Sequence, residues 1–164
     1  MKENIKIGII GLGQRGDIML ENPIIPMMKN GAGIEIAAVC DLLPDRVTAA
    51  AEKLEKAGFA RPMEFTDYKE LLKIKELDAV YIAVSWEAHA EVAVAAMHAG
   101  KYVGLEAGGA YSVDDCCKLV RAYEETGTEL MLMENCCYGR RELMALNMAR
   151  KGILGNIMHC SGAY

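Results

Sequence analysis

The stretch that decides the fold is 5-IKIGIIGLGQRG-16, an apolar run that leads directly into a glycine-rich turn. The β-branched residues of Ile5–Ile10 predict a buried strand. Gly11, Gly13 and Gly16 have the spacing G-x-G-x-x-G, which opens a helix and cradles the pyrophosphate of a dinucleotide when it follows such a strand. Gly11 permits the tight turn, Gly13 lets the backbone approach the phosphates, and Gly16 lets helix and strand pack closely. The motif alone is weak, but its place between strand and helix predicts a nucleotide site.

An acidic residue follows the second predicted strand, Ile34–Cys40. Asp41 comes directly after that strand and 25 residues after Gly16. This spacing slightly exceeds the ~20 residues usual for such sites, and the segment with Pro23 and Pro26, where we expect the first helix to be interrupted, accounts for the excess. A carboxylate here accepts hydrogen bonds from ribose hydroxyls and repels a 2′-phosphate, which favours NAD over NADP. The alternative is a glycine-rich turn beside a surface aspartate.

Strand-like and helix-like patterns alternate along the rest of the chain. Further strands are expected at Met63–Phe65, 78–84, Tyr102–Leu105, 129–133 and 156–164. Further helices are expected from Pro44 to Gly58, from Ser85 to Gly100, after Ser112, and over 141–151. Ser85 and Ser112 are the expected caps of their helices. The helix from Pro44 has apolar residues at helical spacing, namely Val47, Ala50, Ala51 and Leu54. The helix after Ser112 carries an apolar stripe of Cys116, Leu119, Val120 and Tyr123.

Such alternation with apolar strands predicts an α/β fold, a doubly wound parallel sheet of the Rossmann type with helices on both faces. We assign residues 1–135 to this dinucleotide-binding domain. The last helix and strand exceed what six parallel strands need. Residues 136–164 are therefore expected to be the connecting helix and first strand of a second α/β domain, truncated here.

The bulk composition excludes several classes of protein. Hydrophobic residues make up 52% and charged residues 25%, as in ordinary soluble domains. The net charge of −5 argues against a nucleic acid or an anionic membrane surface as the main partner. No apolar run approaches the ~18 residues that would span a bilayer. We expect a cytoplasmic protein that needs neither a membrane nor nucleic acid.

The six cysteines do not have the spacing of a metal site. They include two adjacent pairs, and no C-x-x-C occurs. Neighbouring side chains on a helix or strand point in different directions, so neither pair is half of a zinc site. We expect buried free thiols in a reducing cytoplasm and no bound metal.

The loop 104-GLEAGGAYSV-113 follows the fifth predicted strand, at the edge of the sheet where ligands bind in such folds. It contains one charged residue, Glu106, and no lysine. The segments IGIIGLGQRG, AAVCD, LDAVYIAVSWEAHAEVAVAAMHAGKYVGLE and ETGTELMLMENCCY together resemble the N-terminal half of the Gfo/Idh/MocA oxidoreductases. In most of that family the corresponding strand ends in Glu-Lys-Pro, whose lysine takes part in proton transfer. Here Ala107 and Gly108 replace the lysine and the proline.

A branch of the same superfamily fits this departure better, namely the NAD-dependent glycosidases typified by α-N-acetylgalactosaminidase. The chain is similar to that branch in 86-WEAH-89, in a glutamate without a following lysine, in 135-NCCY-138 and in 146-LNMARKGILGNIMH-159. The resemblance implies NAD contacts by the residues at Gln14, Arg15, Asp41, Trp86, His89, Glu106, Ala107 and Asn135, and a sugar contact by Tyr164.

The resemblance also implies a chemistry that needs no carboxylate pair. Bound NAD oxidises the C3 hydroxyl of the sugar, the C2 proton becomes acidic, and the leaving group departs by elimination. Water then adds back and the hydride returns, so the cofactor is recycled. Tyr138 and His89 are the candidate proton-transfer residues. A hydrogen-bonded tyrosine at a domain boundary, a solvated or nucleotide-contacting histidine, and plain packing of Trp86 are the alternatives for the individual residues.

Three functional interpretations follow from the sequence. The preferred one is an NAD-dependent glycosidase acting on a carbohydrate. The second is a sugar or polyol dehydrogenase with net hydride transfer and a replacement base, and the third is a nucleotide-binding protein without catalysis. We expect the fragment to be inactive by itself, and the full-length protein to be a homo-oligomer.

Overall fold

The computed structural model describes residues 4–161 of the chain. Two compact units follow one another along the chain, and the division between them falls between Met133 and Glu134. The six strands found in the described residues lie in the first unit, which also contains the glycine-rich turn.

The strands of the first unit form one parallel sheet in the order β3-β2-β1-β4-β5-β6. This order confirms the predicted fold class, a doubly wound Rossmann-type sheet. The strands are β1 (Ile5–Ile10), β2 (Ile34–Cys40), β3 (Met63–Phe65), β4 (Ala79–Ile82), β5 (Tyr102–Leu105) and β6 (Leu130–Leu132). From β1 the strands β2 and β3 are added on one side of the sheet, and β4, β5 and β6 are added on the other. The strand order therefore switches between β1 and β4, which are hydrogen-bonded neighbours. Ligands bind beyond the carboxyl ends of the strands at such a switch point.

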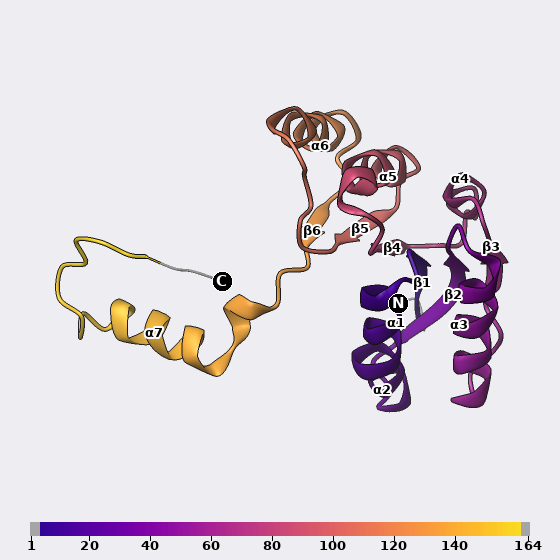
Figure 1. Ribbon diagram of the computed structural model, residues 1–164, viewed down its shortest axis with the longest axis horizontal. Helices are drawn as coiled ribbons and strands as arrows, with labels where there is room; N and C mark the ends of the chain where they lie inside the picture. The colour runs from indigo at the N-terminus through magenta and orange to yellow at the C-terminus, as the bar shows by residue number, and fades with distance from the viewer. Residues whose placement is uncertain (1–3, 162–164) are drawn as a thin grey trace. The chain divides into compact units, whose positions relative to one another are not determined.

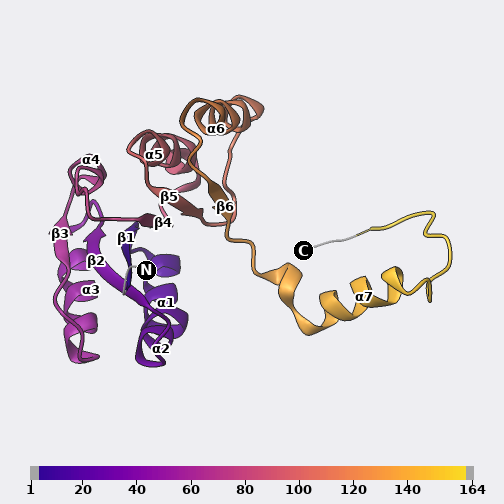
Figure 2. The same cartoon turned by 180° about the vertical axis from the view of Figure 1, so that it is seen from behind.

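Helices cover both faces of the sheet (Figures 1 and 2). On one face lie α1 (Gln14–Met19), α2 (Ile25–Lys29) and α3 (Pro44–Lys56), and on the other α4 (Tyr68–Leu72), α5 (Trp86–His98) and α6 (Val113–Thr126). Two buried clusters result, one under each helical layer. The first is built around Ile9, Leu20, Val39, Val47 and Leu54, and the second around Val80, Ile82, Ala93, Met97 and Leu105.

The proline segment interrupts α-helical hydrogen bonding, as expected, but the chain stays helical through it. Leu20–Ile24, which contains Pro23, forms a π-helical turn between α1 and α2. Proline has no N–H to donate, and the wider turn accommodates the missing bond. Pro26 lies in the first turn of α2, where proline is tolerated.

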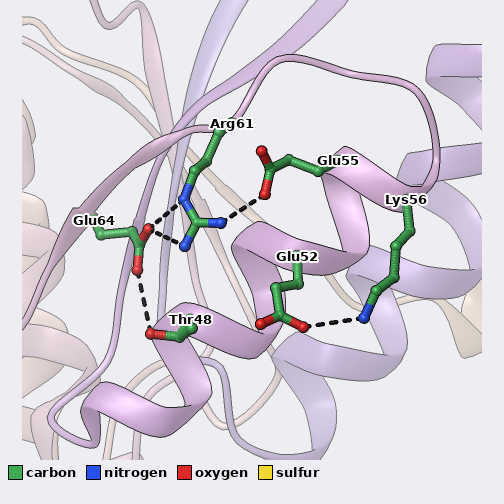
Figure 3. Close-up of polar contacts among 6 residues, drawn as sticks. All are labelled: Thr48, Glu52, Glu55, Lys56, Arg61 and Glu64. Atoms are coloured by element: carbon green, nitrogen blue, oxygen red, sulfur yellow. Dashed lines mark hydrogen bonds and ion pairs between the residues drawn. The ribbon is translucent and has the colours of Figure 1, made fainter.

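Helix α3 shows how a predicted amphipathic pattern becomes packing. Val47, Ala50, Ala51 and Leu54, the apolar positions expected at helical spacing, are all buried. On its exposed side, Arg61 bridges the helix to β3 by contacts of 2.6 Å to both Glu55 and Glu64 (Figure 3). These ion pairs are solvent-accessible, so they contribute little compared with the buried face.

Helix α6 departs from its predicted pattern. Its capping residue, Ser112, is as expected: the hydroxyl accepts a hydrogen bond from the Asp115 N–H at 3.1 Å. Its expected apolar stripe is not buried as a whole, because Cys116, Val120 and Tyr123 are exposed and Leu119 is only partly covered. The buried residue of the helix is Ala122. Helix α6 packs chiefly against α5 rather than against the strands, so only a narrow side of it is buried.

The expectation of buried thiols is correct for Cys40 alone. All six cysteines are free, and the other five are exposed. Adjacent residues on a helix point in different directions, so Cys116 and Cys117 could not both face the core, and in α6 neither does.

The second unit contains a 3₁₀ turn at Cys136–Tyr138 and α7 (Arg140–Arg150), the helix expected over 141–151. The strand predicted for 156–164 is wrong over residues 156–161, which form no regular element. A strand requires a hydrogen-bonding neighbour, and none pairs with this segment among the described residues. The end of the predicted strand, including Tyr164, lies outside the described residues.

Candidate nucleotide-binding site

The predicted site residues of the first unit follow β1, β2, β4 and β5 directly, so they gather at the carboxyl edge of the sheet. The glycine turn follows β1, Asp41 follows β2, His89 lies in the first turn of α5 after β4, and Glu106 follows β5. The switch point between β1 and β4 lies among them. Four segments far apart in sequence therefore meet at one place because parallel strands end on the same side.

Gly11, Gly13 and Gly16 differ in the reason why a side chain is absent at each position. Gly11 has a φ of +94°, and a Cβ there would lie 2.5 Å from the carbonyl oxygen of Ala83. A Cβ on Gly16 would collide with the carbonyl of Gly11, so Gly16 is required for the helix to pack on the turn. Gly13 is the N-cap of α1 and has no side-chain hydrogen bond. A Cβ on Gly13 would lie at an ordinary 3.6 Å from the Arg46 guanidinium, so protein packing does not explain this glycine, whereas a bound pyrophosphate does.

Asp41 ties the end of β2 to the glycine turn. Its side chain is nearly buried, Oδ2 accepts a hydrogen bond from the Leu12 N–H at 2.7 Å, and Oδ1 accepts one from the Leu43 N–H at 3.0 Å. The Arg46 guanidinium lies 3.7 Å from Oδ1. The carboxylate is thus held in one orientation by backbone groups from two loops, and its remaining lone pairs can accept from hydroxyl groups of a ribose.

Glu106 forms a buried polar cluster with Arg15 and Tyr81. Its Oε1 accepts a hydrogen bond from the Tyr81 hydroxyl at 2.7 Å and lies 3.0 Å from Arg15 Nε. Its Oε2 lies 3.2 Å from the Ala107 N–H, which donates to it. The sequence predicted Arg15 and Glu106 as residues of one site, but it did not predict that Tyr81 contributes to that site. The one available signal was a tyrosine in the otherwise aliphatic strand 79-AVYI-82.

The ionisation of this cluster is fixed by its surroundings. Burial raises the pKa of the Tyr81 hydroxyl, and the hydrogen bond to the Glu106 carboxylate raises it further, so Tyr81 remains a neutral donor. Burial lowers the pKa of Arg15, but the hydrogen bond and the charge of Glu106 outweigh it, and the pKa is raised overall. A charged arginine therefore stands in the first turn of α1, directly after the glycine N-cap.

His89 is 1% exposed, and neither of its ring nitrogens has a well-aligned hydrogen-bond partner among the described residues. Burial lowers its pKa, against the opposing influence of the backbone at Val84 and Gly108 and of the Glu106 charge. A neutral imidazole can donate through one nitrogen and accept through the other. The ring is enclosed between the backbone at Val84, after β4, and at Gly108, after β5, so His89 joins the two loops that flank the ligand edge of the sheet.

Trp86 projects into solvent beside the loop that follows β5. It is 61% exposed, so it is not a core residue. Gly108 has a φ of +90°, and a Cβ there would lie 2.8 Å from the indole Nε1. The glycine that replaces the expected proline thus makes room for the indole.

The lysine nearest to this loop along the chain does not replace the missing base. Lys101 is 5% exposed, and its Nζ donates to the carbonyl oxygens of Ile74 at 2.6 Å and Leu77 at 2.9 Å. It precedes β5, whereas Glu106 follows that strand. Lys101 therefore stabilises a loop at the opposite edge of the sheet from the candidate site.

The remaining predicted residues are placed as follows. Gln14 is exposed at the start of α1, and Ala107 is half-buried after Glu106. Asn135 and Tyr138 belong to the second unit, where both are exposed, and the Tyr138 N–H donates to the Asn135 carbonyl oxygen at 3.2 Å. Within residues 4–161, no group of three or more His, Cys, Asp or Glu side chains is arranged to hold a metal ion. No helix in the same range is long and apolar enough to cross a membrane.

A parallel sheet in this order, a glycine turn after its first strand and a carboxylate after its second define a dinucleotide-binding domain. Residues 5–134 match the Gfo/Idh/MocA oxidoreductase family with its NAD-binding Rossmann fold. The chain belongs to this family, and its first unit is an NAD-binding domain.

Two relatives named as glycosyl hydrolases are similar over nearly the whole chain. Glycosyl hydrolase family 109 protein 1 of Bacteroides thetaiotaomicron is 40% identical over 99% of this chain and 34% of its own length. A glycosyl hydrolase family 109 protein of Streptomyces niveus is 38% identical over 99% of this chain and 33% of its own length. The chain spans about a third of the length of these relatives.

Solved structures with the same fold include dehydrogenases. The WlbA dehydrogenase from Bordetella pertussis, in complex with NADH and UDP-GlcNAcA, has a TM-score of 0.81 at 22% identity and covers 94% of this chain and 44% of its own. The myo-inositol 2-dehydrogenase from Lactobacillus plantarum has a TM-score of 0.78 at 22% identity and covers 94% of this chain and 43% of its own. At this identity the likeness shows the fold alone.

Proposed function

We propose that this chain is the cofactor-binding part of an NAD-dependent glycosidase that recycles its cofactor. The observation that carries the proposal is the end of β5, where Glu106 is followed by Ala107 and Gly108 and no lysine is present. The similarity to two proteins named as family 109 glycosyl hydrolases supports the same conclusion. In this proposal the enzyme acts on a glycoside, and its substrate site includes Tyr164.

The residues of the first unit fit the cofactor. The glycine turn would hold the pyrophosphate, Asp41 the adenosine ribose, and Arg15 with Glu106 the part of the dinucleotide that crosses the switch point. When bound, NAD supplies reversible hydride transfer. His89 would donate to or accept from the nicotinamide end or the sugar, and Trp86 would form a wall beside it.

In this proposal Tyr138 and His89 transfer protons. Asn135 is a further contact of the cofactor. The lowered pKa of His89 supports its role as a neutral acceptor rather than a fixed cation. Tyr138 is exposed in its own unit, so its hydroxyl is accessible to a substrate or to a second domain.

The absence of disulfides among the six free cysteines supports a reducing compartment, and we place the enzyme in the cytoplasm.

The full-length protein tests this proposal directly. Incubated with an aryl α-N-acetylgalactosaminide and NAD, it is expected to release the phenol without accumulating NADH, because the hydride returns within each turnover. The second candidate, a sugar or polyol dehydrogenase, is favoured by the oxidoreductase family to which the chain belongs. Steady production of NADH from a free sugar, without cleavage of the glycoside, would establish the dehydrogenase and reject the glycosidase.

A further inference from the structure

Tyr81 carries a polar group into a place where the sheet is otherwise apolar. The residue is 6% exposed and packs with Ile9, Val39 and Leu54 in the buried cluster on the α1–α3 side of the sheet. A buried hydroxyl needs a hydrogen-bond partner, and Tyr81 finds it in the carboxylate that follows the neighbouring strand. The bond spans 2.7 Å, which is short enough for a charge-assisted hydrogen bond.

The accepting oxygen is the one that also holds Arg15. Glu106 Oε1 receives the Tyr81 hydroxyl from β4 and faces Arg15 Nε at 3.0 Å from the first turn of α1. Glu106 is 6% exposed, whereas the Arg15 side chain is 42% exposed. Tyr81 and Arg15 also interact with each other directly. The three side chains therefore form one cluster, with the tyrosine at its buried end and the arginine at its accessible end beside the glycine turn.

We propose that Tyr81 is a positioning residue for NAD: together with Glu106 it fixes the Arg15 guanidinium beside the glycine turn where the dinucleotide binds. A carboxylate bound on one side by a rigid aromatic hydroxyl has one orientation, and an arginine paired with it is preorganised for an anionic ligand. Without the hydroxyl, Glu106 and Arg15 retain each other but lose their anchor to the sheet. This inference rests on the proposed function in taking NAD as the ligand.

The test compares Tyr81→Phe with the wild-type chain, since this change removes one oxygen and leaves charge and packing intact. NAD affinity, measured by isothermal titration calorimetry, is expected to fall about tenfold, the loss typical of one hydrogen bond to a charged group. The matched control is Tyr102→Phe, because Tyr102 is 57% exposed on the adjacent strand. Its affinity for NAD is expected to equal that of the wild type.

A double-mutant cycle separates positioning from a general loss of packing. In an Arg15→Ala background the Tyr81→Phe change is expected to cause no further loss of NAD affinity, because the tyrosine acts on the cofactor through the arginine that it positions. An equal loss in both backgrounds would overturn the proposal and make Tyr81 a residue of purely structural importance. So would an unchanged affinity of Tyr81→Phe for NAD in the otherwise wild-type chain.

A second readout needs no ligand. Solvent exchange of the Arg15 Nε–H, followed by NMR, is expected to be faster in Tyr81→Phe than in the wild type, because the ion pair has lost its anchor. If the wild-type chain fails to bind NAD, the proposed function is rejected, and the exchange rate of the Arg15 Nε–H still shows whether Tyr81 holds the pair. An unchanged rate would contradict the positioning role independently of the cofactor.

Discussion

At the scale of single residues, the site depends on a few buried polar groups with long-range partners. Asp41 accepts from the Leu12 N–H, Glu106 accepts from Tyr81, and His89 keeps two nitrogens without good partners in the described residues. Burial makes each of these groups sensitive to substitution, since an unsatisfied polar atom away from water costs about 1–3 kcal/mol.

Asp41 is expected to set the choice of nicotinamide cofactor. In Asp41→Ala, NAD should bind about tenfold or more weakly and NADP should no longer be excluded, because the charge that repels a 2′-phosphate is gone. Titrations of both cofactors into the same variant give this ratio, which a general loss of stability does not alter. Asp45→Ala, an exposed aspartate in the first turn of α3, is the control. An unchanged NAD to NADP ratio would make Asp41 only the anchor of the Leu12 N–H.

His89 is expected to make the fold sensitive to mild acid. Burial lowers its pKa in the folded chain below the ordinary value of 6.5, so the unfolded chain binds the proton more readily in that window. Its contribution to stability is therefore complete above the ordinary value and is lost as the pH falls through the folded pKa. Denaturant unfolding between about pH 7.5 and about pH 5.5 should show a shallower pH dependence for His89→Gln than for the wild type.

The control for this experiment is His159→Gln, because His159 is exposed in the second unit. Its pH dependence is expected to follow that of the wild type. A wild-type slope that persists in His89→Gln would assign the acid sensitivity to other groups.

At the scale of elements, the strands were predictable and several contacts between them were not. The β-branched runs at Ile5–Ile10 and Ile34–Cys40 and the turn residues around them identify strands without any tertiary information. Helix α4 was missed because Tyr68–Leu72 is one short turn with Asp67 as its cap, too brief for a periodic pattern. The pairing of Tyr81 with Glu106 joins two strands through side chains, and such contacts leave no local pattern in the sequence.

Two serines precede helices, and the structure shows a different hydrogen-bonding role for each. Both Ser85 and Ser112 were expected to cap helices, yet only the Ser112 side chain makes the bond, at 3.1 Å to the Asp115 N–H. Ser112→Ala should lower the free energy of unfolding by about 1 kcal/mol, and Ser85→Ala by clearly less. Thermal or denaturant unfolding of the two variants measures this difference. Equal losses would show that the hydroxyl bond at Ser112 is not what stabilises the start of α6.

At the scale of the whole molecule, the fold indicates cofactor binding, whereas the absence of a lysine after Glu106 bears on the type of reaction. The sheet order and the family show an NAD-binding domain, which the glycine turn and Asp41 already predicted. The proposed chemistry rests on Glu106, Ala107 and Gly108, and the chain spans about a third of the length of its glycosyl hydrolase relatives. The predicted final strand failed because strand formation depends on partners that a local pattern does not reveal.

The central claim is that the full-length enzyme cleaves glycosides by elimination and addition rather than by displacement between two carboxylates. The most direct measurement is hydrolysis of an aryl α-N-acetylgalactosaminide in D₂O, with the product sugar observed by NMR. Elimination removes the C2 proton and the return step takes one from solvent, so the account predicts deuterium at C2 of the product and no accumulated NADH. A released sugar that keeps its original hydrogen at C2 would contradict the account.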